Sequence, residues 1–389
     1  MCGIVGYVGK ENCLDRILKG LESLEYRGYD SAGVAYVEKG KVKIKKCEGR
    51  INKLRENINE RIESHTGIGH TRWATHGKPS DINSHPHKVG KITVVHNGII
   101  ENYNELKGGL LDYEFKSETD TEVIAALIDK MYSLKNNMLT VLADLKYLLV
   151  GSYALGILVD GDDKIYAIRK DSPLIIGVSP DGNYIASDVP AILEFTNMYY
   201  LILNDEYAVL DGEEVVIYDR DGNICPKDLL TFDGSKEAAQ KGGYDHFMLK
   251  EINEQPKVVM DTINPYLENI DLLDEYNLTK YDHITIIGCG SAYHVGLVGK
   301  SLIMKYGLVG VDVDIASEYR YIDHIYGKNE LIILISQSGE TADTLAVLRK
   351  AKEEGVDTLA IVNVVGSSIA RESDNVIYIK AGPEIAVAT

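Results

Sequence analysis

Residues 1–9 read MCGIVGYVG, a short apolar run in which three glycines separate the larger side chains. Runs of this length that are rich in valine and isoleucine are typical of a β-strand. Glycines inside a strand let a neighbouring backbone or a bound substrate come close. Cys2 begins this strand. It is either a small buried thiol or a nucleophile, since the thiol is the best side-chain nucleophile near neutral pH.

The bulk composition indicates a soluble globular protein. The chain has 389 residues, a length that is enough for two or three domains. Of these residues, 45% are hydrophobic and 26% charged, as in ordinary globular proteins. Its 41 basic and 59 acidic residues give a formal charge of −18, which argues against a nucleic-acid or anionic-membrane partner. The longest apolar run, residues 145–159, is too short for a confident membrane span. We expect no signal peptide before Cys2.

The cysteines indicate a reducing compartment. They are odd in number, lie far apart and include no C-x-x-C pair; they are Cys2, Cys13, Cys47, Cys225 and Cys289. This pattern is neither a disulfide framework nor a zinc ribbon. We therefore expect a cytoplasmic protein.

The first 225 residues contain many short β-like runs separated by Gly, Asp or Asn turns. Amphipathic helices are predicted over residues 13–28, 51–62 and 121–134. Many strands with a few helices favour a layered α+β domain, in which sheets pack together with helices outside. We place this domain at 1–225.

The pattern changes after residue 225. Residues 226–245 are polar and read as a linker, and residues 246–267 look helical with a break or new start at Pro256. From residue 281 the chain repeats strand, Gly/Ser turn and helix. Continuous apolar strands that alternate with helices predict a doubly wound parallel sheet. We place this α/β domain at 246–389.

Removal of Met1 would change the chemistry of Cys2. A small residue at position 2 permits this cleavage, which would leave Cys2 with a free α-amino group. That group has a pKa of about 7.7–8.0 and can act as the general base for its own thiol.

Four further motifs accompany the N-terminal CGIVG. They are YRGYDSAG (26–33), HTRWATHG (70–77), HNGIIEN (96–102) and SETDTEV (117–123). Together the five motifs resemble the N-terminal-nucleophile glutaminases of the class II amidotransferases, over essentially all of residues 1–225. The resemblance implies a sandwich with α/β/β/α layers and a Cys2 that attacks the glutamine amide.

The resemblance also implies roles that fit the chemistry of the side chains. Arg72 would grip the α-carboxylate of glutamine and Asp120 its α-ammonium group. The Asn97 side chain and the Gly98 N–H would form the oxyanion hole. The family's remaining pocket residues correspond to Thr75, His76 and His85, with Trp73 as the residue that gates the passage between sites. No metal and no cofactor are implied.

Structural explanations for single residues remain open at this point. Thr119 and Glu122 have the spacing of a helix capping box, which would explain the acidic cluster around Asp120 without a substrate. Arg72 could form an ordinary surface ion pair. Five histidines also crowd into 27 residues, so a metallohydrolase is an alternative class; they are His70, His76, His85, His87 and His96.

A second constellation lies in the C-terminal half. LIILISQSGETADT (331–344) predicts a buried strand that runs into a hydroxyl-rich turn and a helix, where backbone N–H groups and the helix dipole favour phosphate. IIGCGSAYH (286–294) offers a second such turn at a strand end, where open α/β sheets bind ligands. The residues predicted to bind a sugar phosphate are Ser291, Ser336, Gln337, Ser338 and Thr341.

SQSGETADT resembles the sugar isomerase (SIS) domain of the glucosamine-6-phosphate synthases, as do ASEYRY (316–321), NVVGSSIARESD (363–374) and GPEIAVAT (382–389). One departure affects the site. Where that family commonly has CGTS, this chain has CGSA at 289–292, so Ala292 lacks a hydroxyl that would contact the sugar phosphate.

The two resemblances imply glutamine-dependent conversion of fructose 6-phosphate to glucosamine 6-phosphate, the activity of an isomerising glutamine–fructose-6-phosphate transaminase. Glutamine and fructose 6-phosphate would be the substrates, and a homodimer would form through the SIS region. The alternatives are a SIS-type sugar-phosphate sensor without synthase activity and another class II amidotransferase. The family continues with a second SIS domain and a tail that carry sugar-site residues. We therefore expect this chain to be a fragment that hydrolyses glutamine at best.

Overall fold

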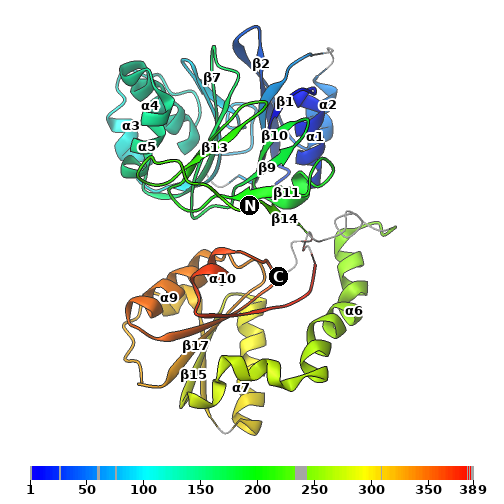
Figure 1. Cartoon of the computed structure of the whole chain (residues 1–389). Helices are drawn as coiled ribbons and strands as arrows, with labels where there is room; N and C mark the ends of the chain where they lie inside the picture. The colour runs from blue at the N-terminus through cyan, green and yellow to red at the C-terminus, as the bar shows by residue number, and fades with distance from the viewer. Residues whose placement is uncertain are drawn as a thin grey trace. The chain divides into compact units, whose positions relative to one another are not determined.

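The computed structural model describes residues 2–25, 28–58, 62–74, 77–232, 243–307, 309–382, 384 and 386. The chain forms two compact units, Met1–Lys236 and Glu237–Thr389, each with its own sheet system (Figure 1).

The first unit contains two antiparallel sheets. The larger one has the strand order β14 (Leu230–Thr231), β11 (Met198–Leu201), β9 (Ile175–Ser179), β10 (Gly182–Ala186), β1 (Gly3–Gly9), β4 (Thr66–Arg72), β2 (Ser31–Glu38) and β3 (Lys41–Glu48). The smaller one has the order β13 (Val215–Tyr218), β12 (Tyr207–Leu210), β8 (Ile165–Lys170), β7 (Gly151–Val159), β6 (Ile92–Ile100) and β5 (His87–Val89).

Helices cover the outer faces of both sheets (Figure 1). In the first unit they are α1 (Cys13–Ser23), α2 (Ile51–Glu56), α3 (Tyr103–Gly108), α4 (Asp120–Lys135), α5 (Met138–Leu148) and the 3₁₀ helix η2 (Val189–Ala191). Helix α1 packs on the larger sheet, and α4 and α5 pack on the smaller one. The order of layers is therefore helix, sheet, sheet, helix, which confirms the predicted α/β/β/α sandwich.

Strand β1 lies in the middle of this sandwich and is buried on both faces. Ile4 and Val8 pack into the core between the two sheets, whereas Val5 and Tyr7 pack under α1. Gly6 faces the inter-sheet core, where an added Cβ would lie 2.6 Å from Cγ1 of Ile185. The opening run therefore needs both its apolar residues and its glycine to let the sheets pack closely.

The second unit is a parallel sheet in the order β16 (Gly310–Ile315), β15 (His283–Gly288), β17 (Glu330–Ser336), β18 (Asp357–Val362) and β19 (Asn375–Tyr378). Its helices are α6 (Phe247–Glu268), η3 (Ile270–Tyr276), η4 (Leu278–Lys280), α7 (Ser291–Tyr306), α8 (Ala316–Tyr319), α9 (Ala342–Glu353) and α10 (Ser368–Glu372). Helices α9 and α10 pack on one face of the sheet, and α7 packs on the other. This confirms the predicted doubly wound α/β architecture.

Some local predictions differ from the structure. Helix α6 continues through Pro256 and also contains Pro265, so the predicted break at Pro256 is wrong. Each proline removes one backbone N–H donor. Ile252, four residues before Pro256, is 53% exposed. Within the predicted linker, Leu230 and Thr231 pair with β11 as a short edge strand. Residues 233–242 of that linker lie outside the described part of the chain.

Candidate functional site

Cys2 is placed by the pairing of β1 with β4. Gly3 lies opposite Thr71 in this antiparallel register, so the residue before Gly3 meets the end of β4 at Arg72 and Trp73. The Trp73 backbone N–H donates to Cys2 Sγ at 3.3 Å, and the thiol is 3.5 Å from the Trp73 carbonyl oxygen, to which it donates. The backbone of one residue therefore holds the sulfur from both sides.

Burial raises the pKa of the Cys2 thiol, and the Trp73 N–H and the Arg72 charge partly oppose this effect. Thiolate chemistry at neutral pH therefore requires a base that removes the proton as the sulfur attacks. A free α-amino group on Cys2 itself would meet this need.

Asn97 and Gly98 lie near the end of β6, on the sheet that faces β1. The Asn97 side-chain amide donates to the Cys2 carbonyl oxygen at 3.0 Å. Val95 belongs to the inter-sheet core, and Asn97, two residues further along the strand, faces the same side. Gly98 has φ of +127°, and an added Cβ would lie 2.1 Å from the Ser152 carbonyl oxygen, so only glycine fits there.

Arg72 ends β4 and is 4% exposed, so it is not the surface ion pair that the sequence left open. Its guanidinium donates to the Gly77 carbonyl oxygen at 3.3 Å. Burial lowers the pKa of Arg72, while the nearby Cys2, Asp120 and Asp30 act in the opposite direction. A buried guanidinium near a thiol is well suited to hold a substrate carboxylate.

Asp120 is the first residue of α4, and it is buried. Its Oδ2 accepts from the Ile100 backbone N–H at 3.0 Å. The Thr119 hydroxyl caps α4 by accepting from the Glu122 N–H at 3.3 Å, and the Glu122 carboxylate accepts from the Ser117 N–H. Capping therefore accounts for Thr119 and Glu122 but leaves the role of Asp120 unexplained.

Three of the histidines, His85, His87 and His96, form a buried layer in which each ring lies against a threonine hydroxyl. His85 Nε2 lies 3.2 Å and His96 Nδ1 3.0 Å from the Thr121 hydroxyl, and His87 Nε2 lies 3.1 Å from the Thr119 hydroxyl. Burial lowers the pKa of all three rings. Among the described residues, no group of three His, Cys, Asp or Glu side chains could hold a metal ion.

The Trp73 side chain makes a different contact from its backbone. Trp73 is 44% exposed, and its ring packs edge-on against that of Tyr29, with ring centroids 5.4 Å apart. Thr75 and His76 lie outside the described residues.

Asp30 is a residue that the sequence reasoning missed. Its carboxylate accepts from the Ala74 N–H at 2.9 Å, and its own N–H donates to the Arg72 carbonyl oxygen at 3.0 Å. Asp30 therefore holds the backbone on both sides of Trp73. The only signal in the sequence was its place in the motif YRGYDSAG, since the bonds join residues more than 40 positions apart.

The residues predicted to bind a sugar phosphate lie at the carboxyl ends of two adjacent parallel strands. Ser291 begins α7 after β15, and residues 336–341 connect β17 to α9. Ser336 is buried, and its hydroxyl lies 2.8 Å from the Thr341 hydroxyl and accepts from the Gly339 N–H. The Ser338 hydroxyl accepts from the Glu340 N–H at 3.2 Å. Gln337 is half-buried and its carbonyl oxygen accepts from the Asn363 N–H.

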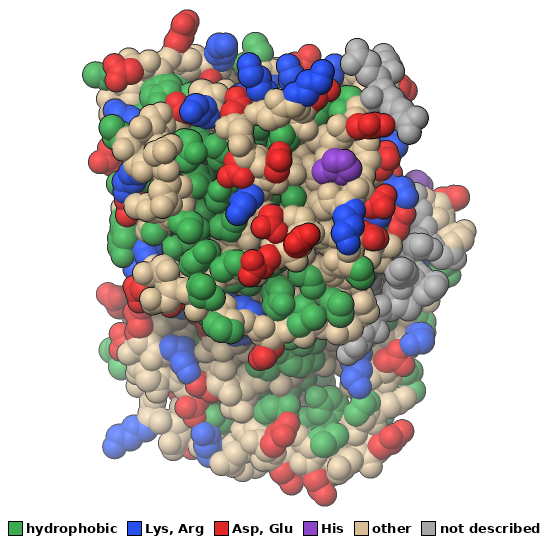
Figure 2. Space-filling view, turned by 45° about the horizontal axis from the view of Figure 1, so that its top comes forward, with side chains coloured by type: hydrophobic (Ala, Val, Ile, Leu, Met, Phe, Trp, Pro, Cys, Tyr) green, Lys and Arg blue, Asp and Glu red, His purple; other side chains and the backbone are tan. Residues whose placement is uncertain are grey.

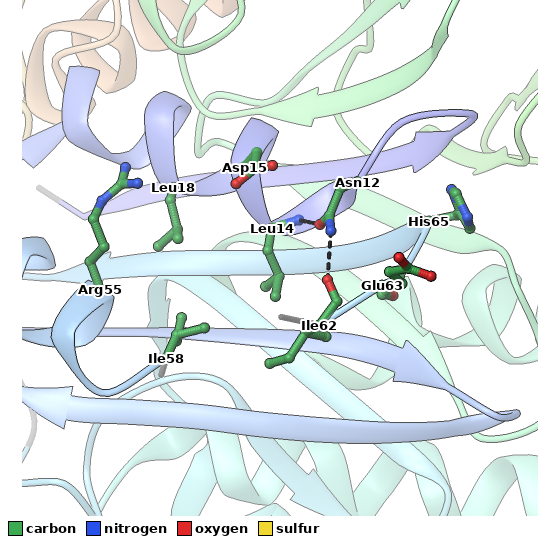
Figure 3. Close-up of a pocket in the computed structure, with 10 residues that line it drawn as sticks. Asn12, Leu14, Asp15, Leu18, Arg55, Ile58, Ile62, Glu63 and His65 are labelled. Carbon is green, nitrogen blue, oxygen red and sulfur yellow. Dashed lines mark hydrogen bonds between the residues drawn. The ribbon is translucent and has the colours of Figure 1, made fainter. Parts of the chain in front are cut away.

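A surface pocket lies elsewhere on the first unit. Figure 3 shows its lining, which includes Asn12, Asp15, Arg55 and His65. His65 precedes β4, and Thr66 pairs with Val8 at the far end of β1 from Cys2. This pocket is therefore separate from the thiol site.

Comparison with known proteins defines the class of each unit. A family model described as "Glutamine amidotransferase domain" matches residues 70–194, and one described as "SIS domain" matches residues 277–389. A glutamine phosphoribosylpyrophosphate amidotransferase from B. subtilis has a similar fold, with a TM-score of 0.50 at 18% identity over 97% of this chain and 91% of that one. The fold and the two matches together define a glutamine amidotransferase domain joined to a SIS domain.

The curated relatives narrow this class to one family. An isomerizing glutamine–fructose-6-phosphate aminotransferase of Clostridium acetobutylicum is 53% identical over all of this chain, and that of Pyrococcus horikoshii is 47% identical. The chain spans 66% of the length of each of these relatives. It belongs to the family of isomerizing glutamine–fructose-6-phosphate aminotransferases.

The backbone at Gly98 provides a test of the site geometry. Gly98→Ala should lower the stability by about 1–3 kcal/mol, because alanine is strained at this φ and its Cβ meets the Ser152 carbonyl oxygen. Urea unfolding measures this loss. Gly109→Ala is the matched control, since Gly109 has φ of −85° and an open surrounding. Equal stabilities of the two variants would contradict the geometry.

Proposed function

We propose that this chain carries the glutamine-hydrolysing centre, and part of the sugar-phosphate site, of an enzyme that converts fructose 6-phosphate to glucosamine 6-phosphate with glutamine as nitrogen donor. The observation that carries the proposal is the placement of the Cys2 thiol against the Trp73 backbone and the Asn97 amide. The names of the relatives, isomerizing glutamine–fructose-6-phosphate aminotransferases, support the choice of substrates.

The proposed reaction begins after removal of Met1. The α-amino group of Cys2 takes the thiol proton, and the sulfur attacks the side-chain amide carbon of glutamine. The amide oxygen becomes an oxyanion that accepts hydrogen bonds from the Asn97 side chain and the Gly98 N–H. The C–N bond then breaks, the proton returns to the leaving nitrogen, and ammonia departs. Water attacks the resulting thioester and releases glutamate.

Arg72 and Asp120 would fix the other end of glutamine. The two buried side chains carry opposite charges, which match the α-carboxylate and α-ammonium groups of an amino acid. His85 would support this pocket from behind, because its ring bonds the Thr121 hydroxyl next to Asp120. From the family resemblance, we also assign Thr75 and His76 to the glutamine pocket and Trp73 to gating the passage between sites.

The SIS unit would bind the sugar phosphate. Residues 336–341 and Ser291 bring hydroxyls and helix N-termini to one edge of a parallel sheet, which is the edge where such sheets bind ligands. Ser336 and Gly339 shape the turn from within, and Ser338 and Thr341 are the hydroxyls we assign to the phosphate. Ala292 lies beside Ser291 without a hydroxyl of its own.

We also propose that the enzyme is cytoplasmic. All five cysteines are free thiols, as expected in a reducing compartment. None of the described helices has the length and apolarity needed to cross a membrane. On the face in Figure 2, basic side chains are interspersed with acidic ones, which fits small-molecule substrates better than nucleic acid.

The role of Cys2 is tested by intact mass after exposure to a glutamine-mimicking electrophile. We expect a protein without Met1 that carries one adduct on Cys2, and glutamine hydrolysis that Cys2→Ala abolishes. Cys225→Ala is the control and should keep both activity and labelling, since Cys225 bonds Glu206 away from this site. Substantial hydrolysis by the Cys2→Ala protein would contradict the assignment.

The phosphate assignment is tested by calorimetric titration with fructose 6-phosphate. Ser338→Ala should weaken binding by about 10- to 100-fold, the range expected for loss of one hydrogen bond to a charged group. Ser301→Ala is the control, because Ser301 is exposed on α7 and donates only to the Leu297 carbonyl oxygen. Equal affinities of the two variants would place the phosphate elsewhere.

We propose in addition that the SIS region mediates homodimer formation. Several large apolar side chains of α6 and α7 are exposed, among them Ile252, Val298 and Leu302, which are each more than half exposed. Such a surface is typical of a protein–protein contact. Sedimentation velocity at micromolar concentration should give the mass of two chains. A single-chain mass that persists as concentration rises would contradict this proposal.

A further inference from the structure

His70 lies directly behind the proposed oxyanion hole. Strand β4 alternates, so that Gly67 and Gly69 lie under α1 while Ile68 and His70 face the smaller sheet. His70 is fully buried. Its Nε2 lies 3.0 Å from the His96 carbonyl oxygen and 3.0 Å from Oδ1 of Asn97.

These two contacts determine which ring nitrogen carries the proton. A carbonyl oxygen can only accept, so Nε2 must be the donor toward His96. The other nitrogen, Nδ1, has no hydrogen-bond partner in the described part of the chain. Burial lowers the pKa of His70 to about 3, and the ring is packed against His85 with centroids 4.2 Å apart. His70 is therefore a neutral imidazole with its proton on Nε2.

The tautomer in turn determines the orientation of the Asn97 amide. The atom that faces the Nε2–H must be an acceptor, so it is the amide oxygen. The NH₂ group then faces Cys2, and one of its two hydrogens is used by the Cys2 carbonyl oxygen at 3.0 Å. The second hydrogen is left to donate to a bound substrate. An amide turned by 180° would present its oxygen to the developing negative charge instead.

We propose that His70 is a positioning residue for glutamine hydrolysis: its Nε2–H holds Oδ1 of Asn97 so that the amide NH₂ points into the oxyanion hole. His70 does not touch the substrate and moves no proton. This role rests on the proposed function, because it matters only if an oxyanion forms beside Cys2. In the part of the chain that the structure describes, the Asn97 side chain bonds the ring of His70 and not those of His85, His87 or His96, which lie against the hydroxyls of Thr121 and Thr119.

Two substitutions separate this role from simple packing. His70→Leu fills much of the space but removes the donor, and it should lower kcat by about 100-fold, as loss of one oxyanion-hole donor does. The KM for glutamine should stay within about twofold, since the substrate's carboxylate and ammonium are held elsewhere. His70→Gln restores an N–H donor and should recover most of the lost kcat.

The matched control is His87→Leu, which removes a buried imidazole bonded to Thr119 and not to Asn97. Its kcat should stay close to that of the unmodified chain. Equal losses in His70→Leu and His87→Leu, or no recovery in His70→Gln, would show that the layer acts only through packing and would overturn the proposal.

The affinities for two glutamine analogues provide a measurement that a purely structural role of His70 would not change. The Cys2 thiol adds to the carbonyl carbon of the γ-aldehyde of glutamate. The carbonyl oxygen then becomes the hemithioacetal oxygen in the oxyanion hole. Glutamate itself occupies the pocket without this bond. His70→Leu should weaken binding of the aldehyde by about 100-fold and leave the affinity for glutamate unchanged. Equal weakening of both would overturn the proposal.

The tautomer can be measured without turnover. Long-range ¹H–¹⁵N NMR spectra of the resting protein should show His70 neutral with the proton on Nε2 between pH 6 and 9. A proton on Nδ1 would overturn the proposal even if the chain hydrolyses glutamine. If the spectrum is as expected and the unmodified chain fails to hydrolyse glutamine or react with the electrophile, the proposed function is at fault and not the orientation of Asn97.

Discussion

The antiparallel register between β1 and β4 is the constraint on which the thiol site depends. Because Gly3 lies opposite Thr71, Cys2 meets the backbone of Trp73, and Arg72 ends the same strand. A slip of one residue would turn every side chain of β1 to the opposite face, exchanging the inter-sheet residues Ile4 and Val8 with Val5 and Tyr7 under α1. The burial of both faces therefore fixes the register, and the register fixes the position of the sulfur.

The second sheet completes the site through the same two-residue period. On β6, Asn97 faces the larger sheet and bonds Cys2, while its neighbour His96 faces α4 and bonds Thr121. Helix α4 begins at Asp120, so the carboxylate is placed by the turn that caps the helix. The two sheets and α4 thus deliver a thiol, an amide, a guanidinium and a carboxylate from separate elements.

Much of this could be predicted from the sequence, and the limits have physical causes. The helix starts at Cys13, Ile51 and near Asp120 follow from amphipathic periodicity and capping residues, which are local signals. The five sequence motifs likewise indicated Cys2, Arg72 and Asn97 as residues of the glutamine site. The domain boundaries and the roles of the site residues remain predictions.

What the sequence could not give is non-local or depends on burial. The bonds of Asp30 to Ala74 and of His70 to Asn97 join distant residues across strands, and no local pattern encodes them. The continuation of α6 through Pro256 was missed because proline inside a helix removes a backbone bond and usually kinks or ends the helix, so the local pattern predicts a break there.

The central claim is that Cys2 forms a covalent bond with the substrate amide carbon. Rapid acid quenching during glutamine turnover, followed by mass spectrometry of the N-terminal peptide, tests it most directly. We predict a γ-glutamyl thioester on a peptide that begins with Cys2, formed within the first turnover and lost when glutamine is exhausted. Steady hydrolysis with Met1 retained, or with the adduct on any other residue, would contradict the account.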